Sequence, residues 1–117
     1  MAFKFEKLLA WQKAMDLNDK IYNLAKNTFP KDEQFILSSQ IRRASDSVVL
    51  NIAEGCTGQS KASFKVFLNY SLRSAIEVVS CLFIAKRRNY IQESAFSYLY
   101  NELETLCKII TGLRNSL

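Results

Sequence analysis

A hydrophobic repeat near the C-terminal end of the chain constrains the fold most strongly. Its members are separated by steps of 3, 4, 3, 4 and 3 residues, and they are Phe96, Leu99, Leu103, Leu106, Ile110 and Leu113. Such steps place every member on one face of a helix, as in the buried seam of a helical bundle. A second row with the same kind of spacing comprises Leu37, Ile41, Ala44, Val48 and Ile52.

Breaks between the periodic segments predict four helices. The chain of 117 residues has one Pro and three Gly, so few residues interrupt the periodicity. We expect helices at about residues 8–28, 31–54, 60–88 and 92–114. Pro30 separates the first two, Gly55 closes the second as a left-handed cap, and Ser60 caps the third. Short joints make neighbours antiparallel, so the predicted fold is an all-α, up-down-up-down four-helix bundle in one domain, residues 1–117.

The third predicted helix has an unusually apolar middle. Residues 75–85 contain one charged residue, Glu77, and hydrophobic residues on several sides of the helix. Because a helix that is apolar on most sides is buried on most sides, we expect another copy of the chain to cover it. The predicted oligomer interface consists of Ile76, Val79, Phe83 and Ile84. The alternative is that these side chains only fill a thick corner of a single bundle.

Charge is concentrated on the same helix. Between residues 61 and 88 six basic residues accompany one acid, which accounts for the whole formal net charge of +5. We interpret the six as contacts to the phosphate backbone of RNA or DNA: Lys61, Lys65, Arg73, Lys86, Arg87 and Arg88. The competing interpretation is that the last three simply complement the negative end of the helix dipole.

A polar row follows the second helix beside its core row. Its members, spaced by 3, 4, 4 and 3, are Gln40, Arg43, Ser47, Asn51 and Glu54. Two interpretations stay open: a hydrogen-bonded network between helices or subunits, or a partly buried site for a partner or small molecule.

Catalysis, cofactors and metals are not expected. The chain has no His, no phosphate-binding loop and no Cys-x-x-Cys pair. Cys81 and Cys107 are expected in the core and Cys56 in a loop. The first residues contain no apolar run like that of a signal peptide, and no segment has the ~20 apolar residues of a membrane span. We therefore expect a cytoplasmic protein without membrane contact.

Several segments together resemble a known family. They include residues 11–17, 29–31, 39–44, 51–55, 60–61 and 90–91. The set resembles the bacterial four-helix-bundle family named for open reading frames within 23S rRNA intervening sequences. The resemblance implies a ring-like homopentamer and kinship with accessory proteins of diversity-generating retroelements, which bind nucleic acid and a reverse transcriptase. The family motif maps onto the polar row and Gly55, whereas Val48-Val49-Leu50 replaces a stretch that usually contains proline.

These features give one leading function and one rival. The leading hypothesis is a non-enzymatic homo-oligomeric module that binds RNA or DNA backbone through the third helix. The rival is a protein-interaction scaffold that makes no direct contact with nucleic acid.

Overall fold

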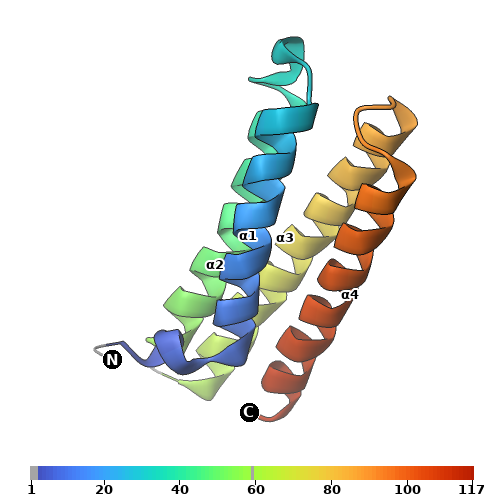
Figure 1. Ribbon diagram of the computed structural model, residues 1–117. Coiled ribbons are helices and arrows are strands. Elements are labelled where there is room, and N and C mark those ends of the chain that lie inside the picture. Colours follow the sequence, from blue (N-terminus) through green and yellow to red (C-terminus); the bar gives the residue numbers. More distant parts are fainter. Residues whose placement is uncertain (1–2, 59) are drawn as a thin grey trace.

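The computed structural model describes residues 3–58 and 60–117 and shows a rod of helices measuring 43 × 23 × 23 Å (Figure 1). The elements, in chain order, are η1 (Lys4–Lys7), α1 (Leu9–Thr28), η2 (Lys31–Glu33), α2 (Leu37–Cys56), α3 (Lys61–Arg87) and α4 (Glu93–Asn115). The two η elements are short 3-10 turns. No strand occurs in the part of the chain that the structure describes.

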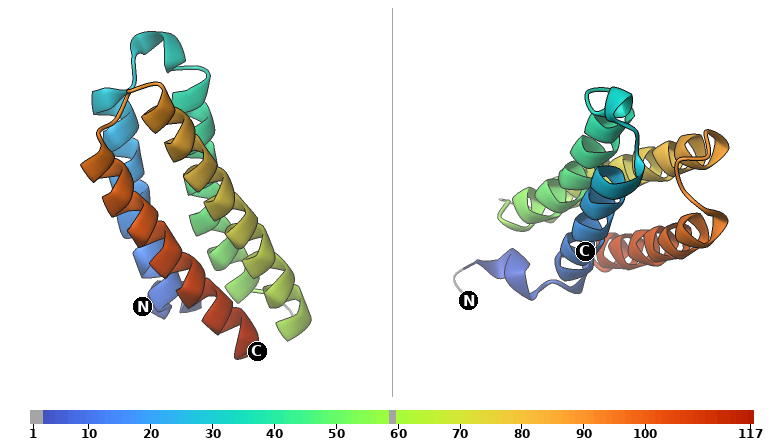
Figure 2. Two further views of the ribbon diagram at one scale, coloured as in Figure 1. Left: turned by 90° about the vertical axis from the view of Figure 1, so that its right-hand side faces the viewer. Right: turned by 45° about the horizontal axis from the view of Figure 1, so that its top comes forward.

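Consecutive helices run antiparallel and lie side by side, and α4 completes the bundle beside α1 (Figures 1 and 2). The α2–α3 contact is the most extensive and the α1–α4 contact the least extensive, while the diagonal pairs do not approach each other closely. The predicted all-α, antiparallel four-helix bundle is thus confirmed.

The buried core follows the predicted hydrophobic rows. All five members of the α2 row are buried, and in α4 only Leu113 of the row is half-buried rather than buried. The corresponding rows of α1 and α3 are Ala10, Ala14, Leu17, Ile21 and Ala25, and Leu68, Ala75, Val78, Leu82 and Ala85. Since these positions recur mostly every three or four residues, each helix buries one continuous stripe.

The second helix begins later than predicted, at Leu37 instead of residue 31. Residues after Pro30 form the turn η2, and Ile36 (φ −119°, ψ −97°) has a backbone conformation that is not helical. A helix that began at residue 31 would carry Glu33 in its first turn. Instead its side chain is buried, and Oε1 accepts a 3.4 Å hydrogen bond from the Leu37 N–H.

Gly55 is not the left-handed cap that the sequence predicted. It lies inside α2, and no described glycine has a positive φ. A Cβ at Gly55 would lie 2.7 Å from Phe67 Cβ and 2.9 Å from Phe64 Cδ1, both on α3. The absence of a side chain at Gly55 therefore allows α2 and α3 to approach each other closely.

The ends of α3 are closed by local hydrogen bonds. Ser60 Oγ accepts from the Ser63 N–H at 3.0 Å, which confirms the predicted N-cap. At the other end Asn89 adopts a left-handed conformation (φ 61°), so the Tyr90 N–H reaches the Ala85 carbonyl at 2.9 Å and the Asn89 N–H reaches that of Lys86 at 3.0 Å. This pair of bonds is a Schellman motif, and it turns the chain toward α4.

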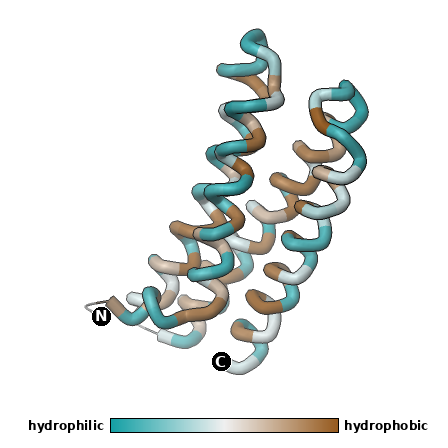
Figure 3. The backbone as a smooth tube through the Cα atoms, viewed as in Figure 1, coloured by the Kyte–Doolittle hydropathy of each residue, from teal (hydrophilic) through white to brown (hydrophobic). Residues whose placement is uncertain are grey.

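Hydrophobic residues occupy most of α3 (Figure 3). By length and composition alone α3 meets the requirement for a membrane span, with a mean hydropathy of 1.3 over its most apolar 18 residues, one third of which are buried. The core helix of a helical bundle meets the same requirement, and α3 packs against both α2 and α4.

Candidate functional site

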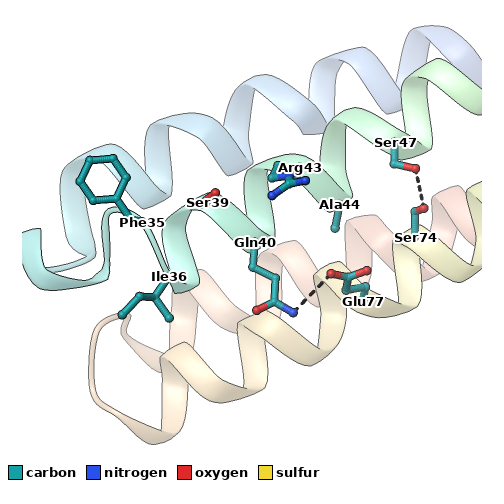
Figure 4. A pocket seen from close by; sticks show the side chains of 9 residues that line it. All are labelled: Phe35, Ile36, Ser39, Gln40, Arg43, Ala44, Ser47, Ser74 and Glu77. Carbon is teal, nitrogen blue, oxygen red and sulfur yellow. Dashed lines mark hydrogen bonds between the residues drawn. The ribbon is translucent and has the colours of Figure 1, made fainter.

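The predicted polar row lies along the groove between α2 and α3. This groove has a volume of about 660 Å³, and it is lined by Phe35, Ile36, Ser39, Gln40, Arg43, Ala44, Ser47, Ser74 and Glu77 (Figure 4). Three members of the row, Gln40, Arg43 and Ser47, therefore line the groove. Asn51 and Glu54 lie further along α2, outside it.

Part of the row forms the predicted network between helices. Ser74 Oγ donates to Ser47 Oγ at 2.8 Å, and Gln40 Nε2 donates to Glu77 Oε2 at 3.4 Å (Figure 4). Asn51 Nδ2 donates to the Ser47 carbonyl at 2.8 Å and to Ser47 Oγ at 2.9 Å. The Ser74 and Gln40 bonds join α2 to α3, and the Asn51 bonds lie within α2. Together they satisfy the inner part of the row.

Arg43 and Glu54 are the outward members of the row. Both are exposed, and neither side chain forms a hydrogen bond or ion pair with another described residue. A charged side chain at the rim of a groove that pairs with no other described residue is available to a second molecule. The row is thus divided into an inner hydrogen-bonded network and an exposed outer part.

Exposed apolar side chains extend the groove into a larger surface. On α2 Ile36 (64% exposed), Arg43 and Leu50 (59%) recur every seven residues, so they share one side of the helix. On α3 Val66, Tyr70, Glu77 and Ile84 share the side on which Glu77 meets Gln40. Together with Phe35, which is 86% exposed, these residues are called the α2–α3 face.

Sequence reasoning missed Phe35 and Ile36. The predicted helix of residues 31–54 placed both within its second turn, where one would be expected to be buried. The available signal was the run of three apolar residues Phe35-Ile36-Leu37, because three consecutive positions on a helix cannot all face the same core stripe.

The four residues predicted for the oligomer interface do not form one patch. Phe83 (51% exposed) packs its ring edge-on against Phe96 of α4 with ring centres 4.8 Å apart, and Ile76 (65% exposed) lies seven residues earlier on the same side. Val79 is half-buried against the core. Only Ile84 (38% exposed) belongs to the α2–α3 face.

Two of the six predicted phosphate contacts are engaged within the chain. Lys86 Nζ lies 2.7 Å from Glu93 Oε2 and 4.4 Å from the centre of the Phe96 ring. The hydrogen bond from Lys86 holds the pKa of Glu93 below its ordinary value. Arg88 Nη1 lies 3.1 Å from Glu33 Oε2. Both cations are thus directed toward acids at the end of the bundle.

The other four predicted contacts are exposed but dispersed. Lys61 and Lys65 lie in the first two turns of α3, Arg73 lies near its middle, and Arg87 is its last residue. Arg87 follows Lys61 by 26 positions, a distance of about 39 Å at the rise of an α-helix. Arg114 of α4 joins the Lys61 end, since its Nη1 donates to Asn69 Oδ1 at 2.8 Å.

Glu33 connects the two joints at one end of the bundle. The Tyr90 hydroxyl donates to Oε2 at 2.7 Å, and Arg88 Nη1 donates to the same oxygen at 3.1 Å. The Tyr90 bond, followed by the Leu37 amide and the Arg88 charge, lowers the pKa of Glu33 against the opposing effect of burial. The carboxylate in turn raises the pKa of Tyr90.

A second groove lies between α1 and α4, where helix contact is thinnest. It has a volume of about 400 Å³ and is lined by Lys20, Asn23, Leu24, Asn27, Thr28, Ala95, Tyr98 and Leu99. Lys20 Nζ crosses it to the Tyr98 hydroxyl at 2.6 Å and to Glu102 Oε1 at 3.0 Å. These two bonds, Tyr98 first, raise the pKa of Lys20.

Comparison with known proteins identifies the family. The sequence profile of the 23S rRNA-intervening sequence proteins matches residues 6–112, which include all of α1, α2 and α3 and most of α4. The chain belongs to this family. No curated protein sequence matches it significantly.

A solved structure supports the same assignment for this 23S rRNA-intervening sequence protein. It is the crystal structure of a protein of unknown function from the S23 ribosomal protein family of Bacteroides thetaiotaomicron. The two chains are 27% identical and superpose with a TM-score of 0.84, over 91% of this chain and 98% of the other. The likeness extends over the whole bundle, and that relative has no assigned activity.

Metal-ligating and nucleophilic side chains are the groups of this chain that bear on catalysis. Among its described residues no three His, Cys, Asp or Glu side chains gather closely enough to hold a metal ion. Cys81 is buried, and burial raises the pKa of its thiol to about 11, so it is a poor nucleophile at neutral pH. The features of the structure that remain to be explained are its exposed surfaces.

Proposed function

We propose that this chain is a non-enzymatic cytoplasmic module that assembles with copies of itself. The α2–α3 face supports the proposal most directly, because Phe35, Ile36 and Leu50 are each more than half exposed on it. Concentrated exposed apolar surface of this kind marks a protein interface. The five-subunit ring implied by the sequence resemblance would cover it on every subunit.

Light scattering coupled to size-exclusion chromatography tests self-assembly. The wild-type chain has a mass of 13.4 kDa and should elute as a multiple of it, near 67 kDa for five subunits. Ile84→Glu should reduce the mass, whereas Asp19→Lys, an exposed change on the side of α1 opposite its core row, should not. A wild-type particle of one chain at micromolar concentration would refute the proposal.

Ile76 and Phe83, two of the residues predicted for the interface, belong to a second exposed patch. With Tyr100 they form an exposed aromatic and aliphatic surface between α3 and α4, and the rings of Phe83 and Tyr100 lie 6.2 Å apart. For this patch to contribute to assembly, a neighbouring subunit must cover the α3–α4 side in addition to the α2–α3 face. Ile76→Glu tests that contribution separately from Ile84→Glu.

Contact with RNA or DNA backbone is the second candidate function. It is supported by the basic end of the bundle, where Lys61 and Lys65 are exposed and Arg114 approaches the same side of α3. Repetition of this end around a ring would multiply the number of phosphate contacts. Filter binding of structured RNA at low salt tests it, and absence of retention would exclude it.

A protein partner other than the chain itself is the alternative to nucleic acid. Arg43 and Phe35 would then meet a different polypeptide. Recovery of one stoichiometric protein partner after nuclease treatment would favour this alternative over the nucleic-acid function.

A further inference from the structure

We propose that Phe35 and Ile36 of one subunit enter the α1–α4 groove of the next subunit, so that the assembly is head-to-tail. The inference rests on the proposed self-assembly and specifies its contact. Four observations support it: a projecting apolar pair, an apolar groove, their positions on opposite sides of the bundle, and a matched pair of opposite charges.

The projecting pair is held in a fixed position by its own chain. Phe35 and Ile36 are 86% and 64% exposed, yet Glu33 before them and Leu37 after them are buried. Glu33 is fixed by Tyr90 and Arg88, and Leu37 is part of the core. Because the residues on both sides of the pair are already held, the backbone that carries it loses little conformational entropy on binding.

The α1–α4 groove has the chemistry that such a pair requires. Its floor includes Leu24, Ala95 and Leu99, and its lining surface is mostly apolar. Its volume of about 400 Å³ accommodates an aromatic ring together with an aliphatic side chain. The thin contact between α1 and α4 keeps the groove open to a side chain from outside.

The pair and the groove lie on opposite sides of the bundle but at the same end. Each helix packs against its chain neighbours and α4 against α1, so the α2–α3 face is opposite the α1–α4 groove. Residues 35 and 36 lie at the end where α1 finishes and α4 begins, and Leu24, Thr28 and Ala95 line the groove there (Figures 1 and 2). Because two different surfaces meet, repetition of the contact gives a closed ring or a filament.

The charges on the two surfaces match in register. Arg43 follows Ile36 by seven residues along α2, and Glu102 follows Ala95 by seven residues along α4. The two helices run in the same direction, so each charge lies about 10 Å further along the bundle than its apolar neighbour. When Ile36 meets Ala95, the guanidinium of Arg43, which pairs with no other described residue, therefore meets the Glu102 carboxylate. Within one subunit that carboxylate forms an ion pair with Lys20 at 3.0 Å.

Mixing two variants tests the head-to-tail contact. Phe35→Asp disables the projecting pair and Ala95→Arg fills the groove, while Phe3→Asp is a control at an exposed phenylalanine near the other end of the bundle. Phe35→Asp and Ala95→Arg should each be monomeric and retain helical circular dichroism, and the control should assemble as the wild type does. An equal mixture of the two should form a dimer of about 27 kDa and nothing larger, because one intact contact remains.

The outcomes separate this inference from the proposed function. A wild-type chain that is monomeric would contradict both the proposed self-assembly and the head-to-tail contact. A wild-type oligomer that persists in Phe35→Asp, or a mixture that stays monomeric well above the concentration at which the wild type assembles, would overturn the head-to-tail contact and leave self-assembly intact.

Charge reversal provides a second test that does not depend on filling the groove. Arg43→Glu and Glu102→Arg should each weaken assembly at least tenfold, and the double variant should restore it by recreating the pair in the opposite sense. Both side chains lie at the surface, so the fold should tolerate the changes. A double variant no better assembled than the singles would contradict the predicted register.

Discussion

The hydroxyl of Tyr90 donates a 2.7 Å hydrogen bond to Oε2 of Glu33 and thereby ties the joint after α3 to the joint before α2. The two residues are 57 positions apart in the chain. The bond, together with that from Arg88 to the same oxygen, fixes the turn from which Phe35 and Ile36 project. The end of the bundle is therefore an ordered surface.

Acid should weaken the bundle through Glu33. Its pKa is lower in the folded chain than in the unfolded chain, so the stabilisation is fully present above the ordinary carboxyl pKa of 4.5. It is lost as the pH falls through the lower, folded value. Urea unfolding between pH 7 and pH 3 should show a steeper loss of unfolding free energy for the wild type than for Glu33→Gln.

Removing the Tyr90 hydroxyl should reduce the acid dependence of stability, as Glu33→Gln does, but to a smaller extent. Tyr90→Phe keeps the ring, which packs 5.9 Å from Phe29, but removes the bond that lowers the Glu33 pKa most. Between pH 7 and pH 3 its unfolding free energy should therefore fall less than that of the wild type and more than that of Glu33→Gln. An acid profile of Tyr90→Phe identical to that of the wild type would show that the Tyr90 bond does not control the Glu33 pKa.

Alanine at two glycines should change stability in opposite directions. Gly55→Ala places a Cβ 2.7 Å from that of Phe67, and we expect a loss of about 1–3 kcal/mol through overpacking. Gly112 lies in α4, and a Cβ there would meet nothing within 4 Å, so Gly112→Ala should stabilise the chain by up to about 1 kcal/mol. Urea titrations of the two variants measure both effects.

Thiol labelling should distinguish the three cysteines. Cys81 is 2% exposed with a pKa of about 11, which leaves roughly a thousandth of the thiol ionised at pH 8. Cys56 is half-buried at the end of α2 and should react first with iodoacetamide in the native chain. Mass spectrometry of timed samples tests the order, and early labelling of Cys81 would show that α3 opens readily.

Any binding of nucleic acid should depend on the exposed cations and not on the paired ones. Lys65→Ala removes one cation that is free to meet a phosphate, so the salt dependence of RNA affinity should become shallower by about one unit of slope. Lys86→Ala should leave that slope unchanged, because Lys86 already pairs with Glu93 at 2.7 Å. If the two substitutions changed the slope equally, Lys86 would also contact the nucleic acid despite its ion pair.

The helical period was enough to predict the bundle. Leu99, Leu103 and Leu106 recur at the spacing of one helix face, and the structure buries all three. Ser60 was also predictable as a cap, because its hydroxyl acts on an amide only three residues away. Signals of this kind depend on a single helix, so they can be recognised in the sequence without knowledge of the tertiary structure.

Features that depend on two helices were not predictable. The role of Gly55 is set by Phe64 and Phe67 on a different helix, and the late start of α2 is set by Glu33 turning inward to Tyr90. The candidate site shows the same limit. Its polar row was predicted from α2 alone, but the division into an inner network and an outward Arg43 depends on Ser74 and Glu77 of α3.

The thin contact between α1 and α4 determines how the fold can open. α4 is bound to the remainder of the bundle chiefly through α3, so it can separate from α1 while the other three helices stay packed. Lys20 of α1 holds the two helices together through its bonds to Tyr98 and Glu102 of α4. A neighbouring molecule seated there would hold α4 closed, and the rigidity of each subunit would then depend on the presence of the next.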